Sequence, residues 1–137
     1  MSTLSVHEAL IYTMVTMSAV DRDMGDDELA RIGALVSDLP VFADFDANGL
    51  VDVAQRCGEE LSTDDDGIVR VIARIRDSLP ERMHETAYAV AVEIAAADLD
   101  VKQEELRLLE LIRDTFELGR LETAAIERGA RARYRIA

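Results

Sequence analysis

Residues 84–106 read His-Glu-Thr-Ala-Tyr-Ala-Val-Ala-Val-Glu-Ile-Ala-Ala-Ala-Asp-Leu-Asp-Val-Lys-Gln-Glu-Glu-Leu, an apolar run that ends in an acidic turn. The same pattern is found at residues 7–29, a shift of 77 positions from His84 back to His7, and the two copies align without a gap. Both copies consist of an apolar segment, the pattern Asp-x-Asp-apolar-x-x-x-Glu-Leu, and an amphipathic segment. The matched acids are Asp21, Asp23 and Glu28 in the first copy and Asp98, Asp100 and Glu105 in the second.

This repetition predicts a duplicated helix-turn-helix, with half-repeats at about residues 4–40 and 81–117 and a pseudo-twofold relation between them. Two copies of this length are too few for a solenoid. Apolar residues cover most of the circumference of segments 9–20 and 87–96. Because a helix that is apolar all round is buried, we expect these two segments to pack together at the centre of the protein, with the remaining helices around them.

The whole chain, residues 1–137, is predicted to be a single all-α domain. It has only two prolines, and no stretch alternates apolar and polar residues as a strand would. Helices are expected at residues 4–20, 26–38, 47–60, 65–78, 81–97, 103–116 and 120–132. The second helix has an apolar stripe of Leu29, Ile32, Leu35, Val36 and Leu39, and the sixth has one of Leu106, Leu109, Ile112 and Phe116, so both stripes are expected to face the core.

Composition excludes several classes of protein. The net charge is −13, the hydrophobic fraction is 49% and aromatic residues make up 4%. The high hydrophobic fraction excludes a disordered acidic tail. Because the chain is acidic and poor in aromatic residues, we do not expect it to bind nucleic acid or anionic lipid. The single cysteine, Cys57, excludes an intramolecular disulfide and favours a cytoplasmic location. No apolar run is long enough to predict insertion into a membrane.

The duplicated acidic turns have two interpretations. Glu28 and Glu105 stand three residues after the presumed N-caps Gly25 and Lys102, where a glutamate closes a capping box. Alternatively, the turns bind metal through Asp21, Glu28, Asp98 and Glu105, with Asp23 and Asp100 at the rim. Such an all-oxygen ligand set favours calcium, magnesium or manganese over zinc.

The two histidines depend on how the central helices are oriented. His7 precedes Asp21 by 14 positions, about 21 Å along a helix, so the two cannot share a ligand. If the central helices run antiparallel, His7 approaches Asp98 and His84 approaches Asp21. If they run parallel, the acidic turns face each other instead. The simplest interpretation of either histidine is a polar residue at a helix start.

Three further features leave more than one interpretation open. Residues 44–51 match the opening of an EF-hand loop, but Gln55 replaces the closing glutamate, so an N-capping loop is favoured. Residues 64–66 are three aspartates, for which a solvated helix start is favoured over a site. Glu93 lies in an apolar helix and is expected to reach solvent, pair with an arginine or line a site. Residues 128–137 hold four arginines and no acid, which suits a helix end, a contact with the acidic body of the protein, or a contact with a partner.

Together these residues resemble the tellurite-resistance TerB family. The sequences Ala-Val-Asp21-Arg-Asp-Met-Gly-Asp-Asp-Glu28-Leu and Ala-Ala-Asp98-Leu-Asp-Val-Lys-Gln-Glu-Glu105-Leu are similar to that family's motif, an apolar helix followed by Ala-Asp-Gly-x-Ile-x-x-x-Glu once in each half. The resemblance extends over about residues 4–130. The family's glycine after the aspartate is Arg22 in one copy and Leu99 in the other, a departure that bears on the geometry of the turn.

The resemblance implies a non-enzymatic helical module, linked to tellurite resistance and stress responses, whose acids at Asp21, Glu28, Asp98 and Glu105 chelate metal. The expected partner is a protein, such as a membrane-associated stress complex, and a homodimer is also open. The alternative is an interaction scaffold whose acidic turns are only helix caps. A hydrolase using paired carboxylates is the least favoured hypothesis, because the sequence holds no nucleophile motif and no phosphate-binding glycine loop.

Overall fold

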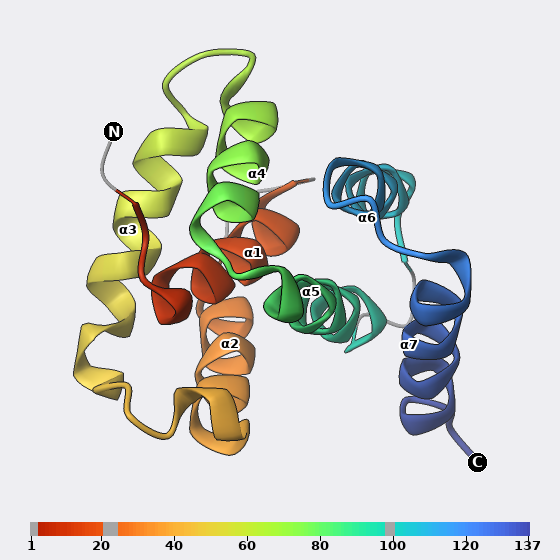
Figure 1. Cartoon of the computed structure of the whole chain (residues 1–137). Coiled ribbons are helices and arrows are strands. Elements are labelled where there is room, and N and C mark those ends of the chain that lie inside the picture. The colour runs from red at the N-terminus through yellow and green to blue at the C-terminus, as the bar shows by residue number, and fades with distance from the viewer. Residues whose placement is uncertain (1–2, 21–24, 98–100) are drawn as a thin grey trace.

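The fold is all-α, as the sequence predicts. The computed structural model describes residues 3–20, 25–97 and 101–137, and within those ranges it has seven α-helices, three short 3-10 helices and no strand. The elements are α1 (Val6–Ala19), α2 (Asp26–Asp38), η1 (Pro40–Phe42), η2 (Ala47–Gly49), α3 (Leu50–Leu61), α4 (Gly67–Ser78), η3 (Glu81–Met83), α5 (His84–Ala97), α6 (Gln103–Thr115) and α7 (Arg120–Arg133) (Figure 1).

The predicted order of helices is confirmed, and the boundaries differ where a local turn replaces the first helical turn. The third helix begins at Leu50 instead of residue 47, because Ala47–Gly49 form a 3-10 turn that the Asp46 side chain caps. The fifth begins at His84 instead of residue 81, because Glu81–Met83 form a 3-10 turn directly after Pro80. Proline lacks the N–H that a helix interior requires, so a new element starts after it.

Helices α1 and α5 form the centre of the molecule and pack against each other. Ten successive residues of α1, from Ala9 to Ser18, are buried, which a helix achieves only when other elements surround it. α1 is covered by α2, α3 and α4, whereas α5 is covered mainly by α6 and α7. The prediction of two central apolar helices is therefore confirmed.

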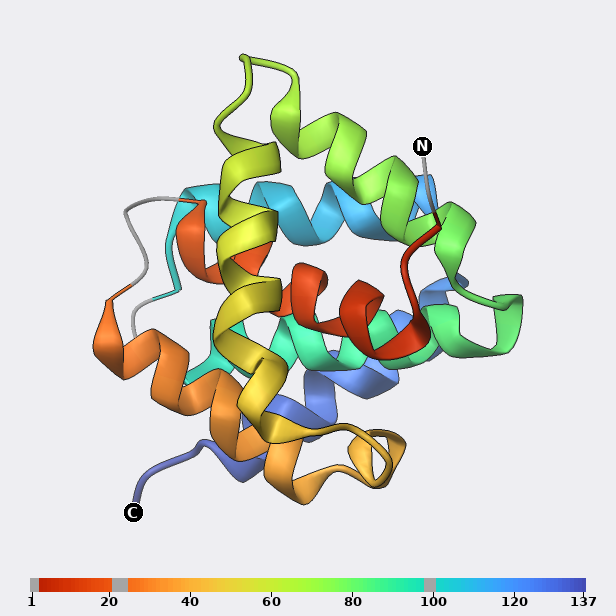
Figure 2. The ribbon, with the colours of Figure 1, turned by 90° about the vertical axis from the view of Figure 1, so that its left-hand side faces the viewer.

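The two central helices run in the same general direction. In Figure 2 both run from right to left, so their C-terminal ends, and the starts of α2 and α6 that follow them, lie on one side of the molecule. The sequence left a parallel and an antiparallel arrangement of these helices open, and the structure has the parallel one. The pseudo-twofold relation between the halves, and the bounds of the half-repeats, stay predictions.

Candidate functional site

Of the four predicted metal ligands, two lie in the described part of the chain. Glu28 is half-buried at the third position of α2, and its Oε2 accepts a hydrogen bond from the Gly25 N–H at 3.2 Å. Glu105 has the same place in α6, and its Oε1 accepts from the Lys102 N–H at 3.2 Å. Both glutamates therefore cap the helix on which they stand. Asp21 and Asp98, with Asp23 and Asp100, fall outside the described residues.

Burial distinguishes the two glutamates. Glu105 is only 5% exposed and is the one charged residue among the buried polar groups of the described ranges. A carboxylate so covered is stable only where donors or cations surround it, and the Lys102 N–H supplies one such donor. Glu105 is thus set deeper in the protein than Glu28.

Helix direction brings the flanking parts of both turns to the same side of the protein (Figure 2). Within residues 3–20, 25–97 and 101–137, no group of three or more His, Cys, Asp or Glu side chains is placed so that it could hold a metal ion. Two of the four predicted ligands lie inside the described ranges and two lie outside them, so the metal site stays a prediction.

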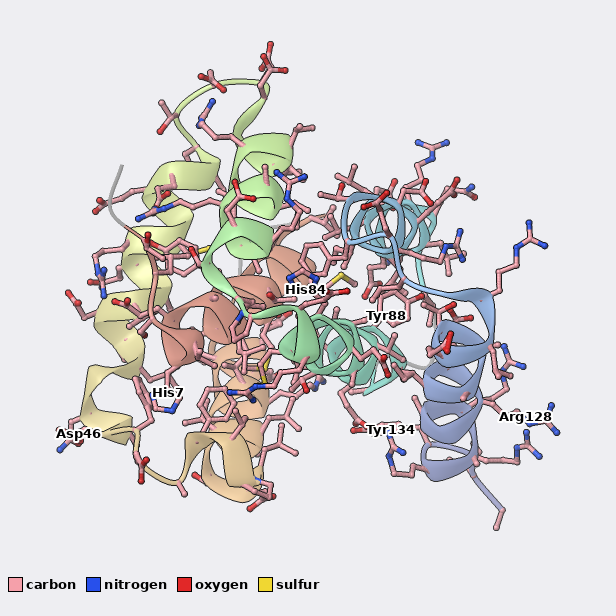
Figure 3. The ribbon with its side chains drawn as sticks, in the orientation of Figure 1. His7, Asp46, His84, Tyr88, Arg128 and Tyr134 are labelled. Atoms are coloured by element: carbon pink, nitrogen blue, oxygen red, sulfur yellow. The ribbon has the colours of Figure 1, made fainter. Side chains whose placement is uncertain are left out.

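Both histidines are used in fixing the starts of the central helices. His7 Nε2 lies 2.9 Å from the carbonyl oxygen of Val41, and its ring contacts those of Phe42 and Phe45. His84 Nε2 lies 3.2 and 3.3 Å from the carbonyl oxygens of Arg76 and Leu79, and its ring lies against Phe116 (Figure 3).

A carbonyl oxygen only accepts, so Nε2 carries the proton in both histidines. Each histidine lies at the start of its helix, as the simplest interpretation expected, and its hydrogen bond ties that helix to a neighbouring segment.

Sequence reasoning missed a set of buried tyrosine–glutamate pairs. Each of the three tyrosines donates its hydroxyl to a glutamate: Tyr12 to Glu60 at 2.5 Å, Tyr88 to Glu127 at 2.6 Å and Tyr134 to Glu93 at 2.8 Å. The partners stand 39 to 48 positions apart in the chain, and nothing in the local pattern indicates such pairs.

Arginines complete two of these pairs. Glu60 also pairs with Arg74, and Glu93 with Arg133. Of the three roles expected for Glu93, pairing with an arginine is the one found. Burial, followed by the bound glutamates, raises the pKa of Tyr12 and Tyr88. Their hydroxyls stay protonated and are not candidates for a general base or a nucleophile.

Cys57 is equally unsuited to chemistry. The thiol is fully buried and lies within 3.8 Å of the Thr16 hydroxyl and 3.7 Å of the Tyr12 carbonyl oxygen. Burial raises the pKa of Cys57 to about 12, so it remains a neutral thiol at physiological pH. It acts as a small core residue in the packing of α3 against α1.

The other acidic loops form local turns. Asp46 Oδ1 accepts a hydrogen bond from the Asn48 N–H at 3.0 Å and caps η2, so the N-capping role predicted for this loop is found (Figure 3). Asp64 Oδ1 accepts from the Asp66 N–H at 2.9 Å, and the carboxylate also pairs with Arg70 at 3.2 Å. These contacts lower the pKa of Asp64, with the Arg70 hydrogen bonds as the largest cause.

Comparison with known proteins gives one match. The model of the family described as Tellurite resistance protein TerB matches residues 7–128, a range that includes both acidic turns and all four predicted ligands. No curated protein and no solved structure matches the chain. None of the helices in the described ranges is long and apolar enough to cross a membrane.

Proposed function

The chain belongs to the TerB family, and from this premise we propose that it is a non-enzymatic stress-response module that binds a divalent cation through its two acidic turns. The ligands are Asp21 and Glu28 in the first half and Asp98 and Glu105 in the second. Carboxylate oxygens prefer hard cations, so calcium, magnesium and manganese are favoured over zinc.

One observation carries this proposal. The same acidic pattern follows both central helices, and those helices run in the same direction, so the elements that flank the two turns lie on one side of the molecule. If the carboxylates of the two turns meet there, they repel one another, and a bound cation would relieve that repulsion. Helix caps alone do not require the aspartates at positions 21 and 98, because an acid at the end of a helix is unfavourable.

A second candidate is a protein-interaction scaffold whose acidic turns are only caps. It is favoured by the hydrogen bonds that Glu28 and Glu105 accept from the N–H groups of Gly25 and Lys102. Under this alternative the repeated glutamates are explained fully by helix formation. The acidic surface would then dock a basic partner, and metal would bind only weakly and without saturation.

Calorimetric titration of the whole chain with calcium, magnesium, manganese and zinc chlorides distinguishes the two candidates. The metal hypothesis predicts saturable heat with at least one of the first three ions and a rise in melting temperature that grows with metal concentration. Asp21→Asn combined with Asp98→Asn should abolish both effects. Asp38→Asn combined with Asp65→Asn removes the same charge at two exposed positions elsewhere and should leave both unchanged.

The outcome that contradicts metal binding is also defined. If the wild type gives no saturable heat and no shift in melting temperature, the turns are caps. The scaffold hypothesis then stands, and Glu28→Gln and Glu105→Gln should affect only stability. If Asp21→Asn and Asp98→Asn each remove half of the bound metal, the turns bind separately; if each removes all of it, they form one shared site.

Cellular context follows from the same premise. We expect a cytoplasmic protein that works with a protein partner, such as a membrane-associated stress complex, or as a homodimer, and that does not bind nucleic acid. The excess of acids supports the last point, because phosphates require cations. Co-purification from cells grown with and without tellurite tests for the partner, and sedimentation of the purified chain tests for the dimer.

A further inference from the structure

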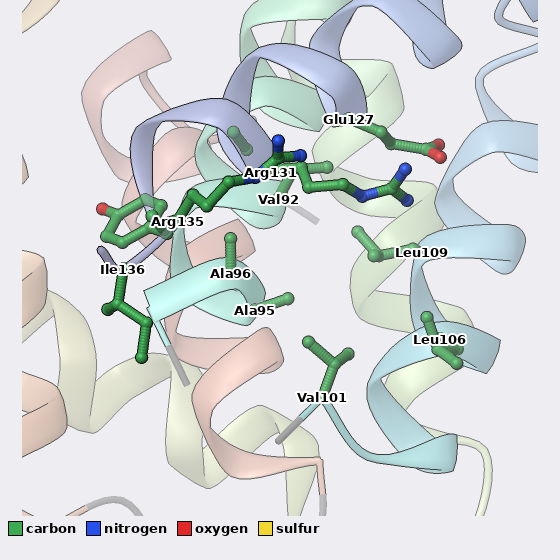
Figure 4. Close-up of a pocket in the computed structure, with 12 residues that line it drawn as sticks. Val92, Ala95, Ala96, Val101, Leu106, Leu109, Glu127, Arg131, Arg135 and Ile136 are labelled. Atoms are coloured by element: carbon green, nitrogen blue, oxygen red, sulfur yellow. The ribbon is translucent and has the colours of Figure 1, made fainter. Parts of the chain in front are cut away.

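An open apolar groove lies between α5, α6 and α7. Its cavity volume is about 530 Å³, and α5 forms the floor while α6 and α7 form the walls (Figure 4). Small residues make up part of the floor and the α7 wall, namely Ala95, Ala96 and Ala130. Small side chains of this kind let a backbone that enters the groove approach closely.

The groove exposes apolar side chains that a folded protein normally covers. Leu106 is 52% exposed, Val101 38% and Ile136 75%, and all three line the groove. Leu29, which stands 77 positions before Leu106 in the repeat, is partly buried and packs against the core. The sequence predicts an apolar stripe on both helices, and in the second stripe Leu106 alone is exposed, whereas Leu109, Ile112 and Phe116 are buried. An exposed apolar face of this kind marks an interaction site.

The α7 side of the groove is positively charged. Arg131 and Arg135 line it and Arg128 lies next to it, and none of the three forms an ion pair with another residue of the described ranges (Figures 3 and 4). The carboxylate of Glu127, which also lines the groove, accepts the Tyr88 hydroxyl hydrogen bond. In a chain with 28 acids and 15 basic residues, three arginines on one side of a groove are a local concentration of positive charge that can pair with an external anion.

The spacing of these arginines indicates more than one anion. Arg128 and Arg131 are three residues apart and Arg131 and Arg135 four, so the first step covers about 4.5 Å along the helix. Acidic side chains three or four residues apart on another helix have the same spacing. A ligand with a single anionic group would pair with only some of these arginines. Arg128 and Arg131 on α7 match the edge of a helix that is apolar on one face and acidic beside it, and Arg135, which follows the end of α7, adds a third cation on the same side.

We propose that this groove is a docking site for an acidic amphipathic helix of a partner protein. The helix lies alongside α7, its apolar face enters the groove against Leu106 and Ala96, and its acidic edge pairs with Arg131 and Arg135. This is a helix-in-groove interaction, in which apolar anchors supply affinity and the rim charges supply orientation. The groove adjoins the second acidic turn, because Val101 and Leu106, which line it, belong to the repeated pattern that contains Glu105.

A synthetic peptide of about 16 residues provides the probe, long enough to form a helix when bound. It has leucine and alanine on one face and glutamate beside that face, and it carries a fluorescent label for anisotropy. A matched peptide has lysine in place of each glutamate. We expect saturable binding of the acidic peptide to the whole chain and at least about tenfold weaker binding of the lysine peptide.

Variants of the chain localise the binding. Arg131→Glu combined with Arg135→Glu should weaken the acidic peptide by about tenfold or more and should favour the lysine peptide. Arg82→Glu combined with Arg120→Glu changes the net charge equally at exposed positions outside the groove and should leave the affinity unchanged. Leu106→Ser tests the apolar wall without altering charge, and because Leu106 is half exposed this variant should keep its fold.

Several results would overturn the proposal. One is an acidic peptide that fails to bind the wild type, or that binds the Arg131→Glu, Arg135→Glu variant equally well. A second is that laurate, below its micellar concentration, binds the wild type whereas the peptide does not. The occupant of the groove would then be a fatty acid. A third is a dimer of the wild type, seen in sedimentation, that the arginine variant abolishes, which would make the occupant a second copy of this chain.

Discussion

At the scale of single residues, buried hydroxyl–carboxylate contacts are the main polar features inside this protein. Tyr12 is 1% exposed, and its hydroxyl reaches Glu60, whose carboxylate also pairs with Arg74 on the neighbouring helix α4. The Arg74 guanidinium also lies over the Tyr12 ring, 5.9 Å from its centroid. Three side chains from α1, α3 and α4 are thus held together by one carboxylate. Each buried polar atom in such a network needs its partner.

Tyr12→Phe tests the contribution of this contact to stability. The substitution removes the donor to the Glu60 carboxylate and keeps the ring, so we expect a loss of about 2 kcal/mol in the free energy of unfolding. Urea denaturation measures it. Tyr134→Phe removes a similar hydroxyl–carboxylate contact close to the C-terminal end of the chain, where local opening lowers its cost, and should lose less. Equal losses in the two variants would contradict the network.

At the scale of elements, glutamates at the third helical position start three of the helices. Glu8, Glu28 and Glu105 each accept a hydrogen bond from the N-cap N–H of α1, α2 and α6. In α1 the capping box is complete, because the Ser5 hydroxyl also accepts from the Glu8 N–H at 3.0 Å. The structural role that the sequence predicted for Glu28 and Glu105 is therefore present, and any metal ligation would have to share these oxygens with the caps.

The cap of α1 predicts a pH dependence of stability. The hydrogen bond from the Ser5 N–H, followed by the contact with Arg56, holds the pKa of Glu8 below its ordinary value of 4.5. The ionised form therefore stabilises the fold. That contribution is fully present above pH 4.5 and is lost as the pH falls through the lower pKa of the folded state.

Glu8→Gln should accordingly cost about 0.5 kcal/mol at neutral pH, since it removes a charge at a helix N-terminus and a surface ion pair. The difference from wild type should close as the pH falls below 4.5, where the wild-type residue also becomes neutral. Urea denaturation at a series of pH values measures this. Glu59→Gln, at an exposed position on α3, should show no such convergence, and a gap for Glu8→Gln that stays constant with pH would count against the assignment.

At the scale of the whole molecule, the packing of α5 at the centre depends on small residues. Ala87 and Ala91 are fully buried within the core cluster, and α5 packs against α1, α6 and α7. Alanine at these positions permits close approach of the neighbouring helices, and a tightly packed interior has no room for a larger side chain.

Ala91→Leu is expected to lower the free energy of unfolding by about 2 kcal/mol, because added methyl groups force neighbouring side chains and backbone to shift. Thermal and urea denaturation both report it. Ala34→Leu makes the same substitution at an exposed position on α2 and should be close to neutral. A stable Ala91→Leu variant would show that the space beside α5 is larger than the burial of this residue indicates.

Prediction from the sequence succeeded where the determinants are local. The helices and their order follow from apolar periodicity and from the two prolines, and the central position of α1 and α5 follows from their all-round apolar surfaces. Leu106 does not take the core position expected of its stripe, because it is 52% exposed whereas Leu109, Ile112 and Phe116 of the same stripe are buried. Periodicity identifies an apolar face, whereas the elements available to cover it are set by the tertiary arrangement.

The acidic turns show the same division. The sequence by itself determined their register, their residue types and the capping role of Glu28 and Glu105, because capping depends on neighbours within three positions. Only the tertiary structure decided that the central helices run in the same direction, that His7 binds the carbonyl oxygen of Val41, 34 positions away, and that the tyrosines meet glutamates 39 to 48 positions away. It also decided that one apolar face stays open beside a row of arginines. These features join segments far apart in the chain, and they arise only when helix packing brings those segments together.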